Sequence, residues 1–421
     1  MEELENLAQL SPLVDGEEAL KAVVDETRNF FNGLTNYEFD KVLGAGAFGI
    51  AFRVIEKHPR DADGRYRRLA VKRAWSTTEQ EDLISEIRTI RGLQGAMHIA
   101  RYIAGTTAPV ASRAEATSDS PRSAKRIRIH IGGRTENKFL SGLQGPVLIM
   151  EYLNNHTFSY IISRAVEMNA HLPNRILWSF FLCLVRACVA LAYPPGVREG
   201  QPAALETIPD DGQEPAGLIH NDLNLGNIIV GDVSPEIPEH SLVPVVKLID
   251  FGAAYQHGRG SSRNLFDISV AMLYLIARGM PSPLPQAEYD GAKTEAGEIV
   301  PDGGGANYPT LDHDLRDLLA RCLSVDSKRR PDLRTMLEET QRGAAKTADA
   351  YAPHQKLETE DVIRATLERL VLSAEEVPAD AVTNDGFVAL GKAAAAKGDA
   401  MDTVGDATNT TGDTMDTTTG G

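Results

Sequence analysis

The sequence predicts an α+β fold, in which a small antiparallel sheet with one helix precedes a mainly α-helical part. Short apolar runs typical of strands occur within the first 153 residues, and longer apolar runs follow them. The chain has 421 residues, which is too long for one small domain and fits two packed parts with extensions at both ends. Hydrophobic residues make up 42% of the chain, enough for a sizeable core.

The first part is expected to begin with a helix. Residues 17–33 carry apolar side chains at helical spacing, and this helix would pack on the sheet. A second helix is predicted over residues 79–93, because apolar residues from Leu83 to Leu93 recur on one face. Strands are predicted at residues 42–43, 49–54, 69–74, 99–103 and 147–153.

The second part is expected to be built around one apolar helix. The longest apolar run, residues 176–193, has the length of a membrane span, but Ser179 and Arg186 interrupt it. We interpret this run as a buried core helix and expect no membrane association. Later helices are predicted at residues 311–323, 331–339 and 360–372.

Three polar segments separate these elements. Residues 105–145 contain a basic run and are interpreted as a disordered surface insert, with a nuclear localisation signal or a phosphate-binding patch as alternatives. Residues 194–215 and 231–244 are interpreted as exposed loop inserts. The predicted divisions are an acidic helical extension at 1–36, the two main parts at 37–153 and 154–342, a helical segment at 343–379 and a disordered tail at 380–421.

Composition and cysteine usage narrow the function classes. The net charge of −16 argues against a general nucleic-acid binder. The three cysteines, Cys183, Cys188 and Cys322, include no pair at metal-site spacing and no disulfide framework, which is typical of a reducing intracellular compartment, cytoplasmic or nuclear. Cys183 and Cys188 are expected to be buried in the apolar helix. No signal peptide is predicted, and we expect a monomer.

Six separated motifs carry the chemistry. A glycine-rich turn, Gly44-Ala45-Gly46-Ala47-Phe48-Gly49, lies between two predicted strands, where glycine lets backbone N–H groups approach phosphates. The other motifs, in chain order, are Leu69-Ala70-Val71-Lys72, Glu86, His220-Asn221-Asp222 with Asn227, Asp250-Phe251-Gly252, and Asp267. Each motif alone is weak support, whereas six in this order are hard to obtain by chance.

With these motifs the chain resembles the eukaryotic protein kinase superfamily over roughly residues 37–340. The resemblance implies a two-lobed protein kinase-like fold, with the sheet and its helix in a small N-terminal lobe and a mainly α-helical C-terminal lobe. It also implies ATP and Mg²⁺ as cofactors and phosphorylation of a protein serine or threonine as the reaction.

The resemblance assigns nucleotide binding to the first part. Lys72 would reach the α- and β-phosphates, and Glu86 would hold it in position. Met150 would be the gatekeeper, and the backbone of Glu151 and Leu153 would bind the adenine edge. The residues expected to contact ATP are Leu43, Gly44, Ala45, Gly46, Ala47, Phe48, Gly49, Ala51, Ala70, Lys72, Met150, Glu151, Leu153 and Ile229.

The resemblance assigns the chemical step to the second part. Asp222 would accept or orient the proton of the attacking hydroxyl, and Asn227 and Asp250 would bind Mg²⁺. His220 and Phe251 would stack, with Asp267 on a buried helix anchoring them. The residues expected to be catalytic are Lys72, Glu86, Asp222, Asn227 and Asp250.

The catalytic loop departs from the family pattern at two places. Asn221 stands where most members carry the arginine that pairs with a phosphorylated activation loop, so we expect no switching of that kind. Asn224 stands where serine/threonine kinases carry a lysine, and Gly226 stands where tyrosine kinases carry a cation. Loss of a preorganised charge at the transferring phosphoryl group can cost about 10²–10³ in rate, so we expect reduced turnover or replacement of the cation by an arginine or lysine from elsewhere in the chain.

The segment after the Asp-Phe-Gly motif is also short. Asp267 follows Asp250 by 17 residues without an Ala-Pro-Glu, so the partner of Arg330 in Lys328-Arg329-Arg330-Pro331 is left open. Three functions fit these departures. An atypical protein serine/threonine kinase is favoured, and the alternatives are a weakly active or inactive scaffold and a small-molecule kinase similar to aminoglycoside or choline kinases.

Overall fold

A computed structural model describes residues 17–46, 49–60, 66–74, 77–107, 136–196, 202–301 and 307–372. Ala47 and Phe48 of the glycine-rich turn lie outside the described residues. So do residues 108–135 of the 105–145 insert and the whole of the 380–421 tail, and the predictions for them stay predictions. The interpretation of the insert as a disordered surface segment is wrong for its last part, because Phe139, Leu140 and Leu143 are buried.

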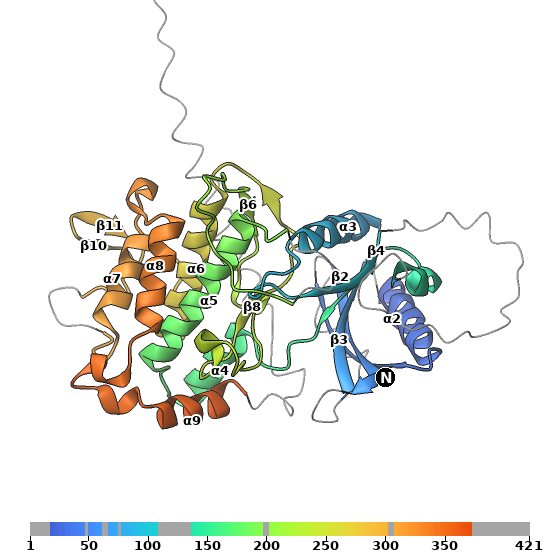
Figure 1. Ribbon diagram of the computed structural model, residues 1–421, viewed down its shortest axis with the longest axis horizontal. Coiled ribbons are helices and arrows are strands. Elements are labelled where there is room, and N and C mark those ends of the chain that lie inside the picture. The colour runs from blue at the N-terminus through green and yellow to red at the C-terminus, as the bar shows by residue number, and fades with distance from the viewer. Residues whose placement is uncertain are drawn as a thin grey trace, which may run out of the picture.

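The α+β class is confirmed. The described residues contain one five-stranded antiparallel sheet, in the order β1-β2-β3-β5-β4, and eight α-helices. The sheet belongs to residues 17–151, which we call the sheet region, and residues 152–372 are the helical region (Figure 1). The strands of the sheet are β1 (Tyr37–Gly46), β2 (Gly49–Arg60), β3 (Tyr66–Arg73), β4 (Tyr102–Thr106) and β5 (Val147–Glu151).

The strand predicted at residues 99–103 begins later than expected, at Tyr102. The reason is that the preceding residues pair with β8 (Val246–Leu248) of the helical region. The Leu248 N–H donates to His98 O, and the Ala100 N–H donates to Leu248 O, both at 3.0 Å. This short ladder ties the sheet region to the strand that leads into Asp250.

Both helices predicted for the sheet region are confirmed as α2 (Glu17–Asn32) and α3 (Thr77–Gly92). Helix α2 buries Val24 and Phe31 against the sheet. The nearly buried Arg73 fixes this contact, because its guanidinium donates to Thr27 Oγ1 at 2.9 Å and to Glu26 Oε2 at 3.0 Å. A short helix, η2 (Glu136–Gly142), leads towards β5.

Helix α3 joins the two regions. Its apolar residues Leu83, Ile87 and Ile90 are buried in the same hydrophobic cluster as the helices of the helical region. Met150 and Leu148 of β5 belong to that cluster as well. Helix α3 is therefore held by the packing of both regions, which fixes the direction of the side chains on its inner face.

The helical region is built around α5 (Asn174–Ala192), as predicted for the apolar run. Helix α5 is long and apolar enough to cross a membrane, but 89% of its most apolar stretch is buried inside the protein, so it is a core helix. Glu358 caps its first turn, accepting from the N–H groups of Asn174 at 2.9 Å and Arg175 at 3.0 Å. The remaining α-helices are α4 (Phe158–Glu167), α6 (Gly260–Ala277), α7 (His313–Cys322), α8 (Leu333–Ala344) and α9 (Glu360–Leu370).

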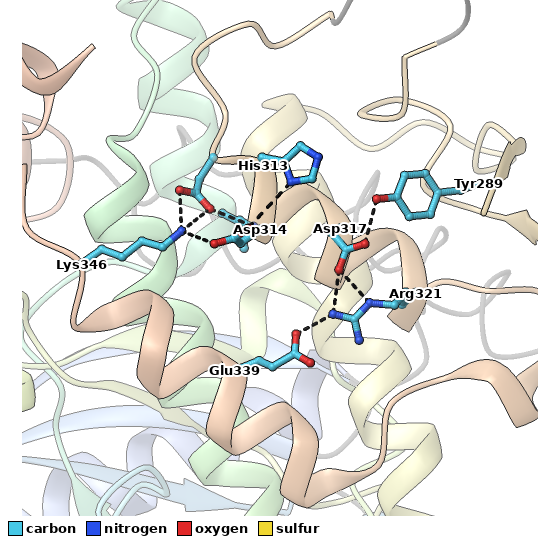
Figure 2. Close-up of polar contacts among 9 residues, drawn as sticks. Tyr289, His313, Asp314, Asp317, Arg321, Glu339 and Lys346 are labelled. Carbon is cyan, nitrogen blue, oxygen red and sulfur yellow. Dashed lines mark hydrogen bonds and ion pairs between the residues drawn. The ribbon is translucent and has the colours of Figure 1, made fainter. Parts of the chain in front are cut away.

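Ion pairs join the late helices predicted from the sequence. Arg321 of α7 binds Asp317 at 2.8 Å and Glu339 of α8 at 2.5 Å, and Tyr289 donates to Asp317 at 2.8 Å (Figure 2). Tyr289 belongs to a hairpin formed by β10 (Ala287–Tyr289) and β11 (Ala292–Thr294). Lys346, just after α8, binds both Asp312 and Asp314 at the start of α7. These contacts hold α7, α8 and the hairpin as one unit.

The two inserts interpreted as exposed loops are partly buried, so that interpretation is wrong for some of their residues. Glu206 is 4% exposed and His240 is 1% exposed. His240 ends a short helix, η4 (Pro238–His240), inside the second insert. Both side chains contact His98, which lies 2.6 Å from Glu206 Oε2 and 3.1 Å from His240 Nε2, so these buried polar groups have partners inside the protein.

Candidate active site

The site is centred on Lys72, which lies near the end of β3. Its ammonium nitrogen is 2.8 Å from Glu86 Oε2 and 2.7 Å from Asp250 Oδ1. Glu86 projects from the inner face of α3 and is fully buried. Three charged groups from a strand, a helix and a loop 178 residues away in sequence therefore meet at one point.

The charges of this cluster support one another. Burial lowers the pKa of Lys72, but the carboxylates of Asp250 and Glu86 outweigh burial and raise it above its usual value. Burial likewise favours the neutral form of Asp250, and Lys72 outweighs this effect and lowers its pKa. Lys72 is thus a cation and Asp250 an anion at neutral pH.

The Asp-Phe-Gly residues follow β8 through a sharp turn. Asp250 has φ of 63°, in the left-handed region that Asp tolerates better than most residues. Its Oδ1 also accepts from the Gly252 N–H at 3.3 Å, and the Phe251 N–H donates to Glu86 Oε1 at 3.3 Å. The turn therefore aims the Asp250 carboxylate at Lys72 and sends the Phe251 ring into the core.

The buried ring of Phe251 contacts His220, as predicted, with ring centroids 4.6 Å apart. The Nε2–H of His220 donates to Ile249 O at 3.0 Å, and Nδ1 accepts from the Asp222 N–H at 3.3 Å. These partners assign the neutral tautomer with the proton on Nε2. Burial lowers the pKa of His220 to about 4, so the imidazole is a structural group that positions Asp222.

Asn221 has φ of 64°, which gives a structural reason for the residue found there. Asparagine enters the left-handed region more readily than longer side chains do, because its amide can hydrogen-bond locally. The chain reverses at this residue between β6 (Leu218–Ile219) and η3 (Leu225–Asn227). This reversal brings Asp222 to the edge of the site.

Two asparagine side chains hold the carboxylate of Asp222. The Asn224 amide donates to Oδ1 at 3.0 Å, and the Asn227 amide donates to Oδ2 at 2.9 Å. Asn224 also accepts from the Gly226 N–H at 2.8 Å and so caps η3. Asn224, which replaces the lysine of the family pattern, is therefore a second clamp on Asp222.

The residues expected to hold Mg²⁺ lie together and offer suitable atoms. The Asn227 amide nitrogen is turned towards Asp222, which leaves the amide oxygen as a ligand atom. The Ile249 N–H donates to Asn227 O at 3.0 Å, so Asn227 is anchored beside the residue that precedes Asp250. The hydrogen bonds of the Asp250 carboxylate to Lys72 and Gly252 both use Oδ1. Amide and carboxylate oxygens are the hard ligands that Mg²⁺ takes, so the residues fit this ion.

The glycine-rich turn joins β1 to β2. Gly49 has φ of 125°, and a Cβ there would lie 2.4 Å from Arg73 O, so the backbone of β3 requires glycine. A Cβ on Gly44 or Gly46 would have no described atom within 4 Å. Packing by the described residues does not require glycine at these two positions.

The other residues expected to bind ATP lie on the strands beside Lys72. Within the sheet Ala51 pairs with Lys72 and Ala70 pairs with Met150, which is 8% exposed. Leu43 on β1 is exposed, and Leu153 after β5 and Ile229 on β7 (Ile228–Val230) are half-buried.

Glu151 has partners that limit its expected role. Its N–H donates to Arg101 O at 3.0 Å, and its carboxylate binds Lys247 at 2.5 Å. Lys247 lowers the pKa of this carboxyl although burial opposes it. The N–H and side chain of Glu151 are thus used inside the protein, and the expected contact of the Glu151 backbone with adenine stays a prediction.

The anchoring role expected of Asp267 belongs to Asn264, one turn earlier on α6. Asn264 Oδ1 accepts from the His220 N–H at 3.1 Å, and its amide donates to Leu218 O at 2.7 Å. Asp267 instead pairs with Arg263 at 2.9 Å. Burial raises the pKa of Asp267 to about 6, although Arg263 opposes the change. Both residues lie on helix α6, so the sequence motif identified the correct helix and the wrong turn.

Arg330, whose partner the sequence left open, contacts an aromatic ring. Its guanidinium lies over Phe266 at 4.2 Å from the ring centroid, and Nε donates to Ser324 O at 2.9 Å. Phe266 is the neighbour of Asp267 on α6, so Arg330 supports the helix that anchors the catalytic loop. No sequence signal pointed to this aromatic partner.

No protein-family model matches the chain, and no curated protein matches it.

Proposed function

We propose that the protein is an ATP- and Mg²⁺-dependent phosphotransferase with a two-lobed protein kinase-like fold, and that it phosphorylates serine or threonine side chains of proteins. The observation that carries the proposal is the contact of Lys72 with both Glu86 and Asp250. A cation held between two carboxylates, one of which also has an oxygen for Mg²⁺, is the arrangement that phosphoryl transfer from ATP uses.

In this proposal the sheet region and α3 form the N-terminal lobe, and the helical region forms the C-terminal lobe. Lys72 binds the α- and β-phosphates, and Glu86 keeps its ammonium in place from the buried face of α3. Asn227 and Asp250 hold Mg²⁺, which supplies positive charge to the phosphates when bound. Gly44 and Gly46 leave space for the phosphates beside β1 and β2.

Asp222 acts on the acceptor hydroxyl. Its carboxylate is oriented by Asn224 and Asn227, so its remaining lone pairs have a defined direction. It takes the proton of the attacking oxygen as the new O–P bond forms and the bond to the ADP oxygen breaks. Because the His220 imidazole accepts the Asp222 N–H, the backbone of this loop is fixed as well.

The absence of a lysine at position 224 makes this a slow enzyme. Asn224 gives Asp222 a hydrogen bond but no positive charge for the γ-phosphoryl group. The expected cost of losing that charge is about 10²–10³ in rate. The second asparagine clamp keeps the base oriented, which supports retained activity over an inactive scaffold.

One observation favours a second acceptor class, the hydroxyl group of a small molecule. Only residues 252–259 separate Phe251 from α6. Two of these eight residues, in β9 (Tyr255–Gln256), pair with β6 immediately before the catalytic loop. This short, exposed segment gives little surface for binding an extended peptide. Small-molecule kinases share this lack of a peptide-binding surface.

The test is transfer of γ-labelled phosphate from Mg-ATP, with the chain itself, generic protein substrates and small hydroxyl compounds as separate acceptors. Label on protein that is lost in Asp222→Asn supports the protein kinase, and label on a small molecule alone moves the assignment to the second class. Asp210→Asn is the matched control, since that side chain is 90% exposed and forms its ion pair with Arg334 of α8. Bound ATP without Asp222-dependent label on any acceptor would overturn the enzymatic proposal.

A further inference from the structure

A second buried polar cluster, which we call the imidazole–thiol cluster, consists of His98, Cys183 and His240. One ligand atom from each residue lies within 4.8 Å of the others, and all three residues are buried. They come from three elements: the turn between α3 and β4, the middle of α5, and the end of η4. None of the three belongs to the candidate active site.

The distances within this cluster suit a tetrahedral ion. The two Nε2 atoms of His98 and His240 are 3.1 Å apart. Two nitrogens bound at 2.0–2.1 Å to one tetrahedral zinc lie about 3.3 Å apart. Small movements of the rings would therefore admit the ion between the two nitrogens and the sulfur.

A carboxylate holds one of the two rings. Glu206 Oε2 lies 2.6 Å from His98 Nδ1, and Glu206 Oε1 accepts from the His98 N–H at 2.8 Å. A carboxylate on the far nitrogen is the usual partner of a metal-binding histidine, because it fixes the tautomer and leaves the other nitrogen free to bind. His98 is thus oriented with Nε2 towards Cys183 and His240.

Arg186 holds the loops that carry these ligands. It lies one turn after Cys183 on α5, binds Glu239 through Nε at 2.7 Å and donates to Glu206 O at 2.5 Å. Glu239 precedes His240, so both inserts are pinned to the same face of α5. The cluster is assembled by contacts that do not depend on the imidazoles or the thiol themselves.

Hydrogen bonds inside the protein leave part of the cluster unsatisfied. His240 Nδ1 is buried and has no hydrogen-bond partner in the described parts of the chain. Two imidazoles that face each other through Nε2 can share only one proton. An ion between the two Nε2 atoms would take the place of that shared proton, whereas Nδ1 lies on the other side of the His240 ring and needs a separate partner.

We propose that His98, Cys183 and His240 bind one Zn²⁺ ion, with Glu206 orienting His98 and a small ligand such as water in the fourth position. Two nitrogens and one thiolate are the donors that zinc prefers, and they exclude the hard ion Mg²⁺. Binding releases the thiol proton to solvent as the zinc–sulfur bond forms. The ion joins the inserts 202–215 and 231–244 to α5 and to the turn before β4.

The test measures metal in the full chain, purified without an affinity tag, by inductively coupled plasma mass spectrometry after dialysis against Zn²⁺ and then against metal-free buffer. We expect one zinc per wild-type chain and a loss of at least tenfold in occupancy in Cys183→Ser. Cys188→Ser is the matched control, because Cys188 is buried on the same helix and should keep the ion. A metal-free wild-type chain, or equal zinc in Cys183→Ser, would overturn the proposal.

If Cys183→Ser does not fold, a second measurement tests whether the thiolate of Cys183 binds the ion. Wild-type chain and Cys188→Ser are loaded with Co²⁺ and their absorption spectra are recorded. Tetrahedral cobalt bound to a thiolate gives strong visible bands and a sulfur-to-cobalt charge-transfer band in the near ultraviolet, and we expect both in each protein. A spectrum without the charge-transfer band excludes Cys183 as a ligand, and one without the strong visible bands excludes a tetrahedral site.

Discussion

The candidate active site and the imidazole–thiol cluster are both assembled from buried charged or polar groups that lie far apart in sequence, yet they differ in their contact with solvent. The Asp250 side chain is 25% exposed, whereas the His98 side chain is completely buried and that of Glu206 is 1% exposed. Asp222 is half-buried. The candidate active site is therefore the open cluster, which suits ligands that enter and leave. The imidazole–thiol cluster is the closed cluster, which suits a permanently bound group that joins parts of the chain.

The two clusters also differ in how their charges are balanced. Lys72 is shared by two carboxylates, so the active site carries negative charge that a Mg²⁺ ion can neutralise. In the closed cluster the carboxylate of Glu206 already has an imidazole as its partner. Removal of one partner should therefore affect folding in the closed cluster and catalysis in the open one.

The largest expected effect on stability comes from His98→Ala. This change removes the ring from the buried Glu206 carboxylate, and among its described partners the backbone N–H groups of residues 98 and 206 remain. An uncompensated buried charge costs about 3–5 kcal/mol. Urea unfolding in the presence of a chelator, followed by circular dichroism, measures the free energy. His98→Ala/Glu206→Gln should recover part of the loss, and an unchanged unfolding midpoint in His98→Ala would show that Glu206 is not held by the ring.

Lys72→Met should affect catalysis more than folding. It removes the cation that contacts Glu86 and Asp250, and the rate of phosphoryl transfer should fall by at least about 10²–10³. The folding cost should be smaller than for His98→Ala, because the Asp250 side chain is 25% exposed and water can solvate it, whereas that of Glu206 is 1% exposed. Single-turnover transfer from labelled ATP and thermal unfolding measure the two effects.

Lys346→Met is the control for that experiment. Lys346 also binds two carboxylates, those of Asp312 and Asp314, but it lies between α7 and α8 (Figure 2). Its loss should leave the transfer rate unchanged. Full activity in Lys72→Met would show that the nucleotide does not use this lysine.

Asn224→Ala should have an intermediate effect on the rate. It removes the hydrogen bonds to Asp222 Oδ1 and from the Gly226 N–H. A hydrogen bond to a charged group is worth about 1.5–3 kcal/mol, so we expect a fall of about 10- to 100-fold. Asn224→Lys should be faster than Asn224→Ala, because it returns a positive charge near the transferring group. Equal rates in Asn224→Ala and the wild type would remove Asn224 from the site.

The open cluster could be predicted from the sequence, and the closed one could not. The order and spacing of the motifs identified Lys72, Glu86 and Asp250, because each lies at a fixed place on a strand, a helix or a turn. Local patterns also predicted α2, α3 and α5. Asn264 was missed because it shares its helix with Asp267, and sequence spacing alone did not distinguish neighbouring turns of α6.

The imidazole–thiol cluster depends on how loops pack. Glu206 and His240 lie in segments rich in proline, glycine and acidic residues, whose composition is that of exposed loops. Arg186, which interrupts the apolar run, holds both segments against α5. Its partners lie 20 and 53 residues later in the sequence. No local sequence pattern encodes such contacts. The proposed ligands His98, Cys183 and His240 lie far apart in the sequence, so they show none of the short spacings by which metal sites are recognised.

The smallest effect expected is a shift in pH dependence, and it separates the two roles of Asn224. Burial raises the pKa of Asp222, while the hydrogen bond from Asn224 lowers it. In the proposed function Asp222 is a base, which requires its ionised form, so the transfer rate should fall with decreasing pH through a pKa above the usual carboxyl value of about 3.9. Asn224→Ala removes the lowering contribution and should move this fall to higher pH. Single-turnover rates measured from pH 4 upwards test this, and a fall that moves to lower pH in Asn224→Ala would show that Asn224 does not stabilise the ionised base.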